Sequence, residues 1–194
     1  MVASGDVCIG PNSVIQTLRA VEHLEGRAMA DALREASKLP SELPGGLIPE
    51  AWFVRLIEVL RRTLPAERAE AALAEAGVRT ADYVTTHRIP TPVRLLLRGL
   101  PARLAIPLLL HAFDRNAWTF AGRGEYGVEG SFPGTIVLRG APTCRGASIH
   151  DHGAYYRAAF ERLLHLADRR VRVREASCES RGADRCRFTI EIEA

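Results

Sequence analysis

The sequence has no long apolar run and no dense block of one charge. The longest strongly apolar run, residues 104–110, is interrupted by Pro107 and is far shorter than the roughly 20 residues of a membrane-spanning helix. The first six residues lack the positive segment and apolar stretch of a secretory signal, which predicts a cytoplasmic protein. The net charge of +3 comes from scattered arginines, so we expect no nucleic-acid-binding surface.

Cysteine is scarce, and its four positions are informative. They are Cys8, Cys144, Cys178 and Cys186. In a secreted protein four cysteines would suggest two disulfides, whereas a reducing cytosol favours free thiols or a metal site. The apolar content of 47% is ample for a hydrophobic core in a chain of 194 residues.

Helical periodicity dominates the first 120 residues. The first helix is expected to begin at an N-cap formed by Asn12 or Ser13, and Pro65 is expected to open a later one that Gly77 ends as a left-handed cap. A loop with three prolines and two glycines covers residues 39–49. The pattern predicts helices over residues 12–33, 50–63, 66–76, 91–100 and 101–118.

The pattern changes after residue 122, where glycine, valine, isoleucine and threonine become frequent. We predict a strand over residues 135–138, a helix over 153–167 and two closing strands over 171–175 and 186–192, whose apolar and polar residues alternate. The closing strands should form an antiparallel hairpin. The sequence therefore predicts an α+β fold in which a helical N-terminal part packs on one face of a small antiparallel sheet.

The end of the chain carries a motif of the form Glu-x-x-Cys, a short turn with glycine, and Cys-x-Phe-x-Ile. Its members are Glu175, Cys178, Gly182, Cys186, Phe188 and Ile190. This motif resembles the signature end of the 4-vinyl-reductase domain family, and the helical N-terminal part is similar to the bacteriochlorophyll 4-vinyl reductases of that family. The resemblance implies a helical region at residues 1–90 and a 4-vinyl-reductase-like domain at 91–194, together forming one compact unit.

The resemblance also implies a structural zinc site. In phenol-sensing relatives the motif's glutamate and two cysteines bind zinc with a cysteine 23 residues before the glutamate, a spacing that lands on His152 here. The implied ligands are His152, Glu175, Cys178 and Cys186, which are residue types that zinc accepts. Cys144 and His150 are rival candidates for the fourth ligand. The alternative is that Cys178 and Cys186 are small buried core residues without a metal.

A chlorophyll precursor would need apolar walls, an axial ligand for magnesium and a cation near its propionate. Residue types within 104–120 suit these roles, with His111 as the axial ligand and Arg115 or Arg123 facing a carboxylate. The candidate binding residues are His111, Phe113, Arg115, Trp118 and Phe120. The alternative is that His111 and Trp118 simply belong to a core helix. Weaker candidates by residue type are His87, His165, Trp52 and Tyr83.

Three functions are compatible with the resemblance. The first is a tetrapyrrole-binding accessory or carrier protein that passes magnesium porphyrin or protochlorophyllide intermediates to enzymes such as magnesium chelatase or methyltransferase, as a homodimer at the edge of photosynthetic membranes. The second is a divinyl (proto)chlorophyllide 8-vinyl reductase, and the third is a small-ligand sensor. Because the sequence shows no dinucleotide motif, flavin-type phosphate loop or iron–sulfur spacing, we expect the carrier.

Overall fold

The computed structural model describes residues 7–145 and 153–193. The helices are α1 (Asn12–Glu25), α2 (Arg27–Ala36), α3 (Glu50–Thr63), α4 (Ala66–His87), α5 (Thr91–Gly99), α6 (Ala102–Asn116) and α7 (Ala154–Leu164), with the short turns η1 (Ala117–Thr119), η2 (Pro142–Cys144) and η3 (Glu179–Arg181). The strands are β1 (Cys8–Ile9), β2 (Ile48–Pro49), β3 (Glu125–Glu129), β4 (Thr135–Arg139), β5 (Val171–Ser177) and β6 (Cys186–Ile192). The predicted α+β fold is confirmed.

The main sheet has the strand order β3-β4-β6-β5, and every pair in it is antiparallel. The predicted closing hairpin is confirmed by the pairing of β5 with β6, in which Val173 lies opposite Ile190. On the other side of the strands, Arg174 forms an ion pair with Glu191 at 2.7 Å. The alternation of buried and paired charged residues gives the sheet one apolar face and one wet face.

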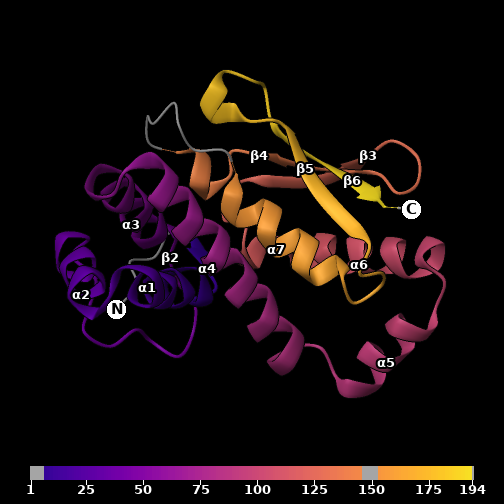
Figure 1. Cartoon of the computed structure of the whole chain (residues 1–194), viewed down its shortest axis with the longest axis horizontal. Coiled ribbons are helices and arrows are strands. Elements are labelled where there is room, and N and C mark those ends of the chain that lie inside the picture. Colours follow the sequence, from indigo (N-terminus) through magenta and orange to yellow (C-terminus); the bar gives the residue numbers. More distant parts are fainter. Residues whose placement is uncertain (1–6, 146–152, 194) are drawn as a thin grey trace.

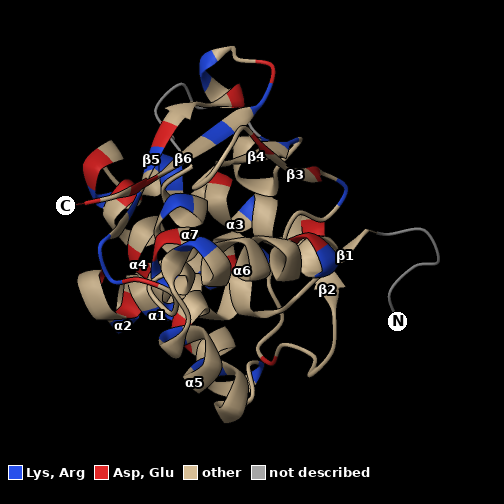
Figure 2. Ribbon diagram, turned by 90° about the vertical axis from the view of Figure 1, so that its right-hand side faces the viewer, with Lys and Arg blue, Asp and Glu red and all other residues tan. Residues whose placement is uncertain are grey.

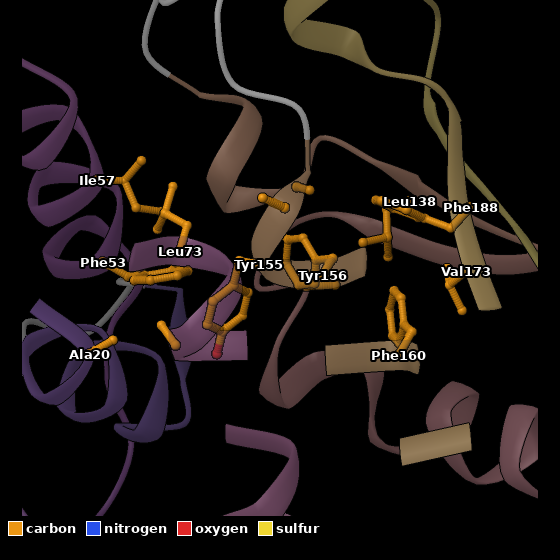
Figure 3. Close-up of a cluster of buried hydrophobic side chains, with 14 of the residues drawn as sticks. Ala20, Phe53, Ile57, Leu73, Leu138, Tyr155, Tyr156, Phe160, Val173 and Phe188 are labelled. Atoms are coloured by element: carbon orange, nitrogen blue, oxygen red, sulfur yellow. The ribbon is translucent and has the colours of Figure 1, made fainter. Parts of the chain in front are cut away.

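Helix α7 is the centre of the molecule, lying between the sheet and α4 (Figure 1). On the side of the sheet, the ring of Phe160 lies 5.8 Å from that of Phe188 in β6. On the other side, Tyr155 lies 5.3 Å from Phe53 of α3. Figure 3 shows these side chains as one continuous series from the helical part to the sheet. The helical and sheet-bearing halves of the chain therefore share one hydrophobic core.

The prediction that Gly77 ends a helix was wrong. Gly77 is buried in the middle of α4, which continues to His87. A Cβ atom at this position would lie only 2.2 Å from the carbonyl oxygen of Tyr155 in α7. Glycine is needed here because the two helix backbones approach closely, and the surrounding alanines and polar residues keep the helix going on both sides.

Three further differences from the predicted elements have local causes. The first predicted helix is divided into α1 and α2 at Gly26, whose φ of 88° a helix cannot accommodate. Helix α1 also begins after Pro11 and not at a capping side chain. The sheet begins at β3, earlier than predicted, because this edge strand is largely exposed and lacks a clear apolar alternation. Among the described residues, no helix is long and apolar enough to cross a bilayer.

Candidate functional site

Three cysteines from separate elements meet at one end of the sheet. Cys144 ends η2 shortly after β4, Cys178 directly follows β5, and Cys186 begins β6. The pairing of β5 with β6 shifts register between Glu175 and Ser177, immediately before Cys178. Such a bulge changes the direction of the strand that carries it, which brings the end of β5 to the other two cysteines.

The three sulfur atoms are close enough to share hydrogen bonds. Cys144 Sγ lies 3.1 Å from Cys186 Sγ and 3.7 Å from Cys178 Sγ, and Cys178 and Cys186 are 3.5 Å apart. These distances exceed the S–S bond of about 2.05 Å, so the cysteines are free thiols. Hydrogen bonds from Cys144 and then Cys186 lower the pKa of Cys178 far below its ordinary value. The hydrogen bond to Cys178 raises the pKa of Cys144 to about 12.

The sulfur geometry suits a metal ion. All three sulfur atoms lie within 4.8 Å of one another, and the described part of the chain contains no other such group of cysteine, histidine or acidic residues. Tetrahedral zinc with bonds of about 2.3 Å would separate its sulfur ligands by about 3.8 Å. The observed separations of 3.1 to 3.7 Å are near this value, so the three cysteines could hold a metal after a small movement.

Glu175 lies beside this cluster but outside the three-sulfur group. Its side chain is only 7% exposed, and its Oε1 is paired with Arg181. Its Oε2 has no hydrogen-bond partner in the described structure, and a Cβ on Gly153 would lie 3.2 Å from it. Burial, followed by the nearby charge of Cys178, raises the pKa of Glu175 to about 7. The free oxygen thus lies close to the start of α7.

Of the predicted metal ligands, Cys178 and Cys186 lie together, and Glu175 lies nearby. His152 and its rival His150 fall outside the described residues. Cys144, which the sequence offered only as another rival, supplies the third sulfur of the cluster.

Two arginines hold the turn that carries Cys144. Arg61 of α3 donates a hydrogen bond to the carbonyl oxygen of Thr143 at 2.7 Å. Burial lowers the pKa of Arg61 to about 10, while the charges of Cys144 and Cys178 act in the opposite direction. The guanidinium group therefore lies close enough to stabilise thiolates. On the other side of the turn, Arg145 donates a hydrogen bond of 2.6 Å to Glu50, whose side chain is 2% exposed.

A separate open cavity of about 480 Å³ lies between α6 and the β3–β4 hairpin. Its lining residues are Pro107, Leu110, His111, Asp114, Tyr126, Val128, Gly130, Ser131, Phe132, Pro133 and Gly134. The hydroxyl of Tyr126 donates a hydrogen bond of 3.2 Å to the carbonyl oxygen of Leu110, which fixes the hairpin against the helix. Burial, followed by the charge of Asp114, raises the pKa of Tyr126 above its ordinary value, so this hydroxyl remains a donor.

The five predicted tetrapyrrole-binding residues are not gathered in one place. His111 lines the cavity, and Arg115 lies one turn further along the exposed side of α6. Trp118 is 56% exposed in η1. Phe113 and Phe120 instead pack into the aromatic core around α7. Only the first of these residues combines access to solvent with a position at the cavity.

The other candidates have structural partners. Arg123 donates to Glu50 through both its backbone amide and its guanidinium group. His87 stacks on Tyr83 with ring centroids 4.3 Å apart, and a ring nitrogen of His165 lies 3.0 Å from a strand carbonyl oxygen. These contacts assign each side chain a role in local packing.

Sequence reasoning missed the opposite wall of the cavity. Tyr126, Val128 and Phe132 belong to β3 and the turn after it, which the sequence analysis treated as a loop. The alternation of Tyr126 and Val128 around Gly127 was the available signal. Pairing this short segment with the clearer strand over 135–138 would have revealed the hairpin.

Comparison with known proteins gives the family. The model of the 4-vinyl-reductase domain matches residues 135–192, which include β4, α7, β5 and β6. The bacteriochlorophyll synthase 23 kDa chain of Cereibacter sphaeroides is 36% identical over 190 residues, covering 94% of this chain and 89% of the relative. The chain belongs to this family. The protein of the same name from Rhodobacter capsulatus is 33% identical over 184 residues, covering 94% of this chain and 86% of the relative. Membership supports a role in bacteriochlorophyll biosynthesis.

Solved structures share the fold at much lower identity. An H-NOX protein from S. oneidensis in the Fe(II)NO ligation state has a TM-score of 0.52 and 14% identity, over 94% of this chain and 99% of that one. A structure from a study of heme distortion in the H-NOX family has a TM-score of 0.59 and 12% identity, over 94% and 95% of the two chains. The arrangement of helices and sheet is thus that of a wider α+β fold, with the family motif at its closing hairpin.

Proposed function

We propose that this protein is a tetrapyrrole-binding accessory or carrier protein that handles magnesium porphyrin or protochlorophyllide intermediates of bacteriochlorophyll biosynthesis. The observation that carries this proposal is the open cavity at α6, in which His111 lies among apolar side chains. Its volume of about 480 Å³ is within the range of roughly 300 to 1,000 Å³ for small-molecule sites. The family supports the pathway, and the fold is one that H-NOX proteins use with heme.

The cavity residues match the chemistry of a flat, apolar ring. Leu110, Val128 and Phe132 offer apolar surface, and the imidazole of His111 offers a nitrogen for the magnesium of the cargo. Arg115, one turn beyond His111 on the same side of α6, is the proposed partner of a propionate carboxylate. The expected complex leaves part of the ring exposed, because the cavity is open on one side.

Partial exposure suits a carrier better than a reductase. Reduction of a vinyl group needs a hydride donor, and the donor's phosphates need free backbone amides. In the Gly122–Arg123–Gly124 loop, the amide of Arg123 donates to the buried carboxylate of Glu50 at 3.2 Å. A phosphate would compete there with a fixed negative charge. We therefore place the protein beside the enzymes of the pathway, with a magnesium chelatase or methyltransferase as the proposed recipient.

We also propose that Cys144, Cys178 and Cys186 hold a structural zinc ion, with Glu175 or His152 as the fourth ligand. The sulfur separations, the nearby Arg61 and the unsatisfied Oε2 of Glu175 support this assignment. Bound zinc would tie together the ends of β4, β5 and β6. A site closed by four protein ligands is structural, so its role is separate from ligand binding at the cavity.

Absorption spectroscopy tests the carrier proposal. Divinyl protochlorophyllide is added to the protein with and without NADPH, and the Soret band and the vinyl signature are recorded. A shifted Soret band without loss of the vinyl group is the expected result. The shift should be lost in His111→Ala and retained in His87→Ala, which removes an exposed histidine away from the cavity. Reduction that depends on NADPH would overturn the carrier, and an unchanged spectrum would overturn tetrapyrrole binding.

Metal analysis of the purified protein tests the zinc proposal. We expect about one zinc per chain in the wild type and none in Cys178→Ser/Cys186→Ser, because two of the proposed ligands are removed. Zinc that is absent from the wild type, or undiminished in the double variant, would show that the assignment is wrong.

A further inference from the structure

Helices α5 and α6 expose an unusual amount of apolar surface. Leu95 and Leu96 of α5 are 62% and 58% exposed, and Leu104 and Leu108 of α6 are 52% and 51% exposed. Leu97 is the single buried residue of α5. Figure 1 shows α5 at the lower edge of the molecule, away from the sheet and from α1 to α3. Large exposed apolar side chains that follow one another along the chain mark an interaction surface.

The charges around these leucines are all of one sign. No aspartate or glutamate occurs in the 31 residues from 83 to 113. The same stretch contains Arg88, Arg94, Arg98 and Arg103, so every formal charge is positive. In Figure 2, α5 carries basic and no acidic residues, whereas the two colours mix elsewhere on the molecule. The surface is complementary to an anionic partner with an apolar layer beneath its charge.

We propose that α5 and the exposed side of α6 dock on a membrane surface that contains anionic lipids. Leucine side chains would enter the boundary between headgroups and acyl chains, while the arginines reach the lipid phosphates. This occupant is favoured over a protein partner because the exposed leucines alternate with arginines and lack the acidic and amide groups that fix a specific protein register.

The docking surface adjoins the proposed ligand cavity. Leu108 lies on α6 one turn before His111, and both side chains are exposed on the same side of that helix. A flat apolar molecule at the membrane surface would therefore meet the cavity opening without crossing bulk water. This link rests on the proposed carrier function, but docking itself depends only on the leucines and arginines.

Vesicle flotation of the full chain tests the docking. Vesicles of phosphatidylcholine with phosphatidylglycerol are compared with vesicles of phosphatidylcholine alone. We expect binding to the anionic vesicles only, weakening as salt is added. The variant Leu95→Ser/Leu96→Ser should bind at least roughly tenfold more weakly, because each buried leucine contributes about 1.5 kcal/mol or more. The control Leu24→Ser/Leu47→Ser changes two exposed leucines outside α5 and α6 and should bind like the wild type.

A charge variant tests the electrostatic part of the surface. We expect Arg98→Glu/Arg103→Glu to lose roughly tenfold or more in affinity for anionic vesicles, whereas Arg19→Glu/Arg169→Glu should not. Circular dichroism and the retention of these variants on size exclusion show that they are folded. If a leucine pair is needed for folding, the second pair Leu104→Ser/Leu108→Ser serves the same test.

Several results would overturn the docking. They are no flotation of the wild type, equal loss in the test and control variants, and a wild-type oligomer that becomes monomeric in Leu95→Ser/Leu96→Ser without binding vesicles. The last result would identify a second copy of the chain as the occupant. His111→Ala separates the two proposals, because it should abolish the Soret shift and leave flotation unchanged.

Discussion

Cys144 Sγ lies 3.1 Å from Cys186 Sγ, although 42 positions separate the two residues in the chain. Their proximity follows from the sheet order, because β4 leads into the turn that carries Cys144 and pairs with β6, which begins at Cys186. Cys178 joins them from the end of β5. The cluster is therefore a product of three elements, and changing any one cysteine tests their common role.

The substitution Cys144→Ser should remove the bound zinc and lower the free energy of unfolding by roughly 3 kcal/mol or more, since the site would lose a ligand. Cys8→Ser is the matched control, because Cys8 is the one cysteine outside the cluster. Zinc content and urea unfolding of both variants provide the measurement. A Cys144→Ser protein that keeps its full zinc content would show that Cys144 is not a ligand.

The substitution Glu50→Gln should destabilise the protein by roughly 2 to 4 kcal/mol, because it removes the charge that Arg123 and Arg145 share in a buried position. The exposed pair partner Asp184 provides a control. Asp184→Asn should cost less than about 1 kcal/mol, as solvent screens its ion pairs with Arg185 and Arg187. Chemical unfolding measures both, and equal effects would contradict a special role for the buried carboxylate.

The substitution Gly77→Ala should lower stability by roughly 2 to 4 kcal/mol, because its Cβ would force α4 away from Tyr155 of α7. Alanine is favoured over glycine by about 1 kcal/mol within a helix, so the predicted sign opposes helix propensity. Gly99→Ala adds a methyl group at a helical position with no atom within 4 Å and should be neutral or slightly stabilising. Thermal unfolding distinguishes the two, and stabilisation of both variants would refute the close approach.

Alkaline pH should destabilise the protein through Tyr155. Burial raises the pKa of Tyr155 from 10.0 to about 12, so the folded state holds this proton more tightly than the unfolded state. The associated stability is complete below the unfolded pKa and is lost as pH rises through the folded pKa. Unfolding free energies measured across this window should fall less steeply for Tyr155→Phe than for the wild type. Parallel curves would contradict the prediction.

The closing hairpin was predictable from the sequence, whereas the complete cysteine cluster was not. Strict alternation along β5 and β6 identified both strands, and the motif they carry placed Cys178 near Cys186. Cys144 joins them only because β4 pairs with β6 and not with β5. A pattern along one strand contains no information about the order of strands in a sheet.

Helix α6 shows a second limit of sequence reasoning. The spacing of Leu104, Leu108, His111 and Arg115 correctly indicated that these residues share one side of a helix. The tetrapyrrole hypothesis needed that side to be part of an enclosed apolar site, yet it is exposed, and the core takes Phe113 from the other side. Periodicity shows which residues lie together, but the packing of the other helices decides which side is covered.

The place of β6 inside the sheet also has a consequence for synthesis of the protein. β3 and β4 can pair as soon as both have left the ribosome, but β5 has no strand partner until β6 follows it. The sulfur of Cys186 arrives with β6, so a nascent chain that lacks this strand has neither a four-stranded sheet nor three clustered thiols. Sheet completion and metal capture are thereby confined to the same late step, and a chain truncated before Cys186 would fail at both.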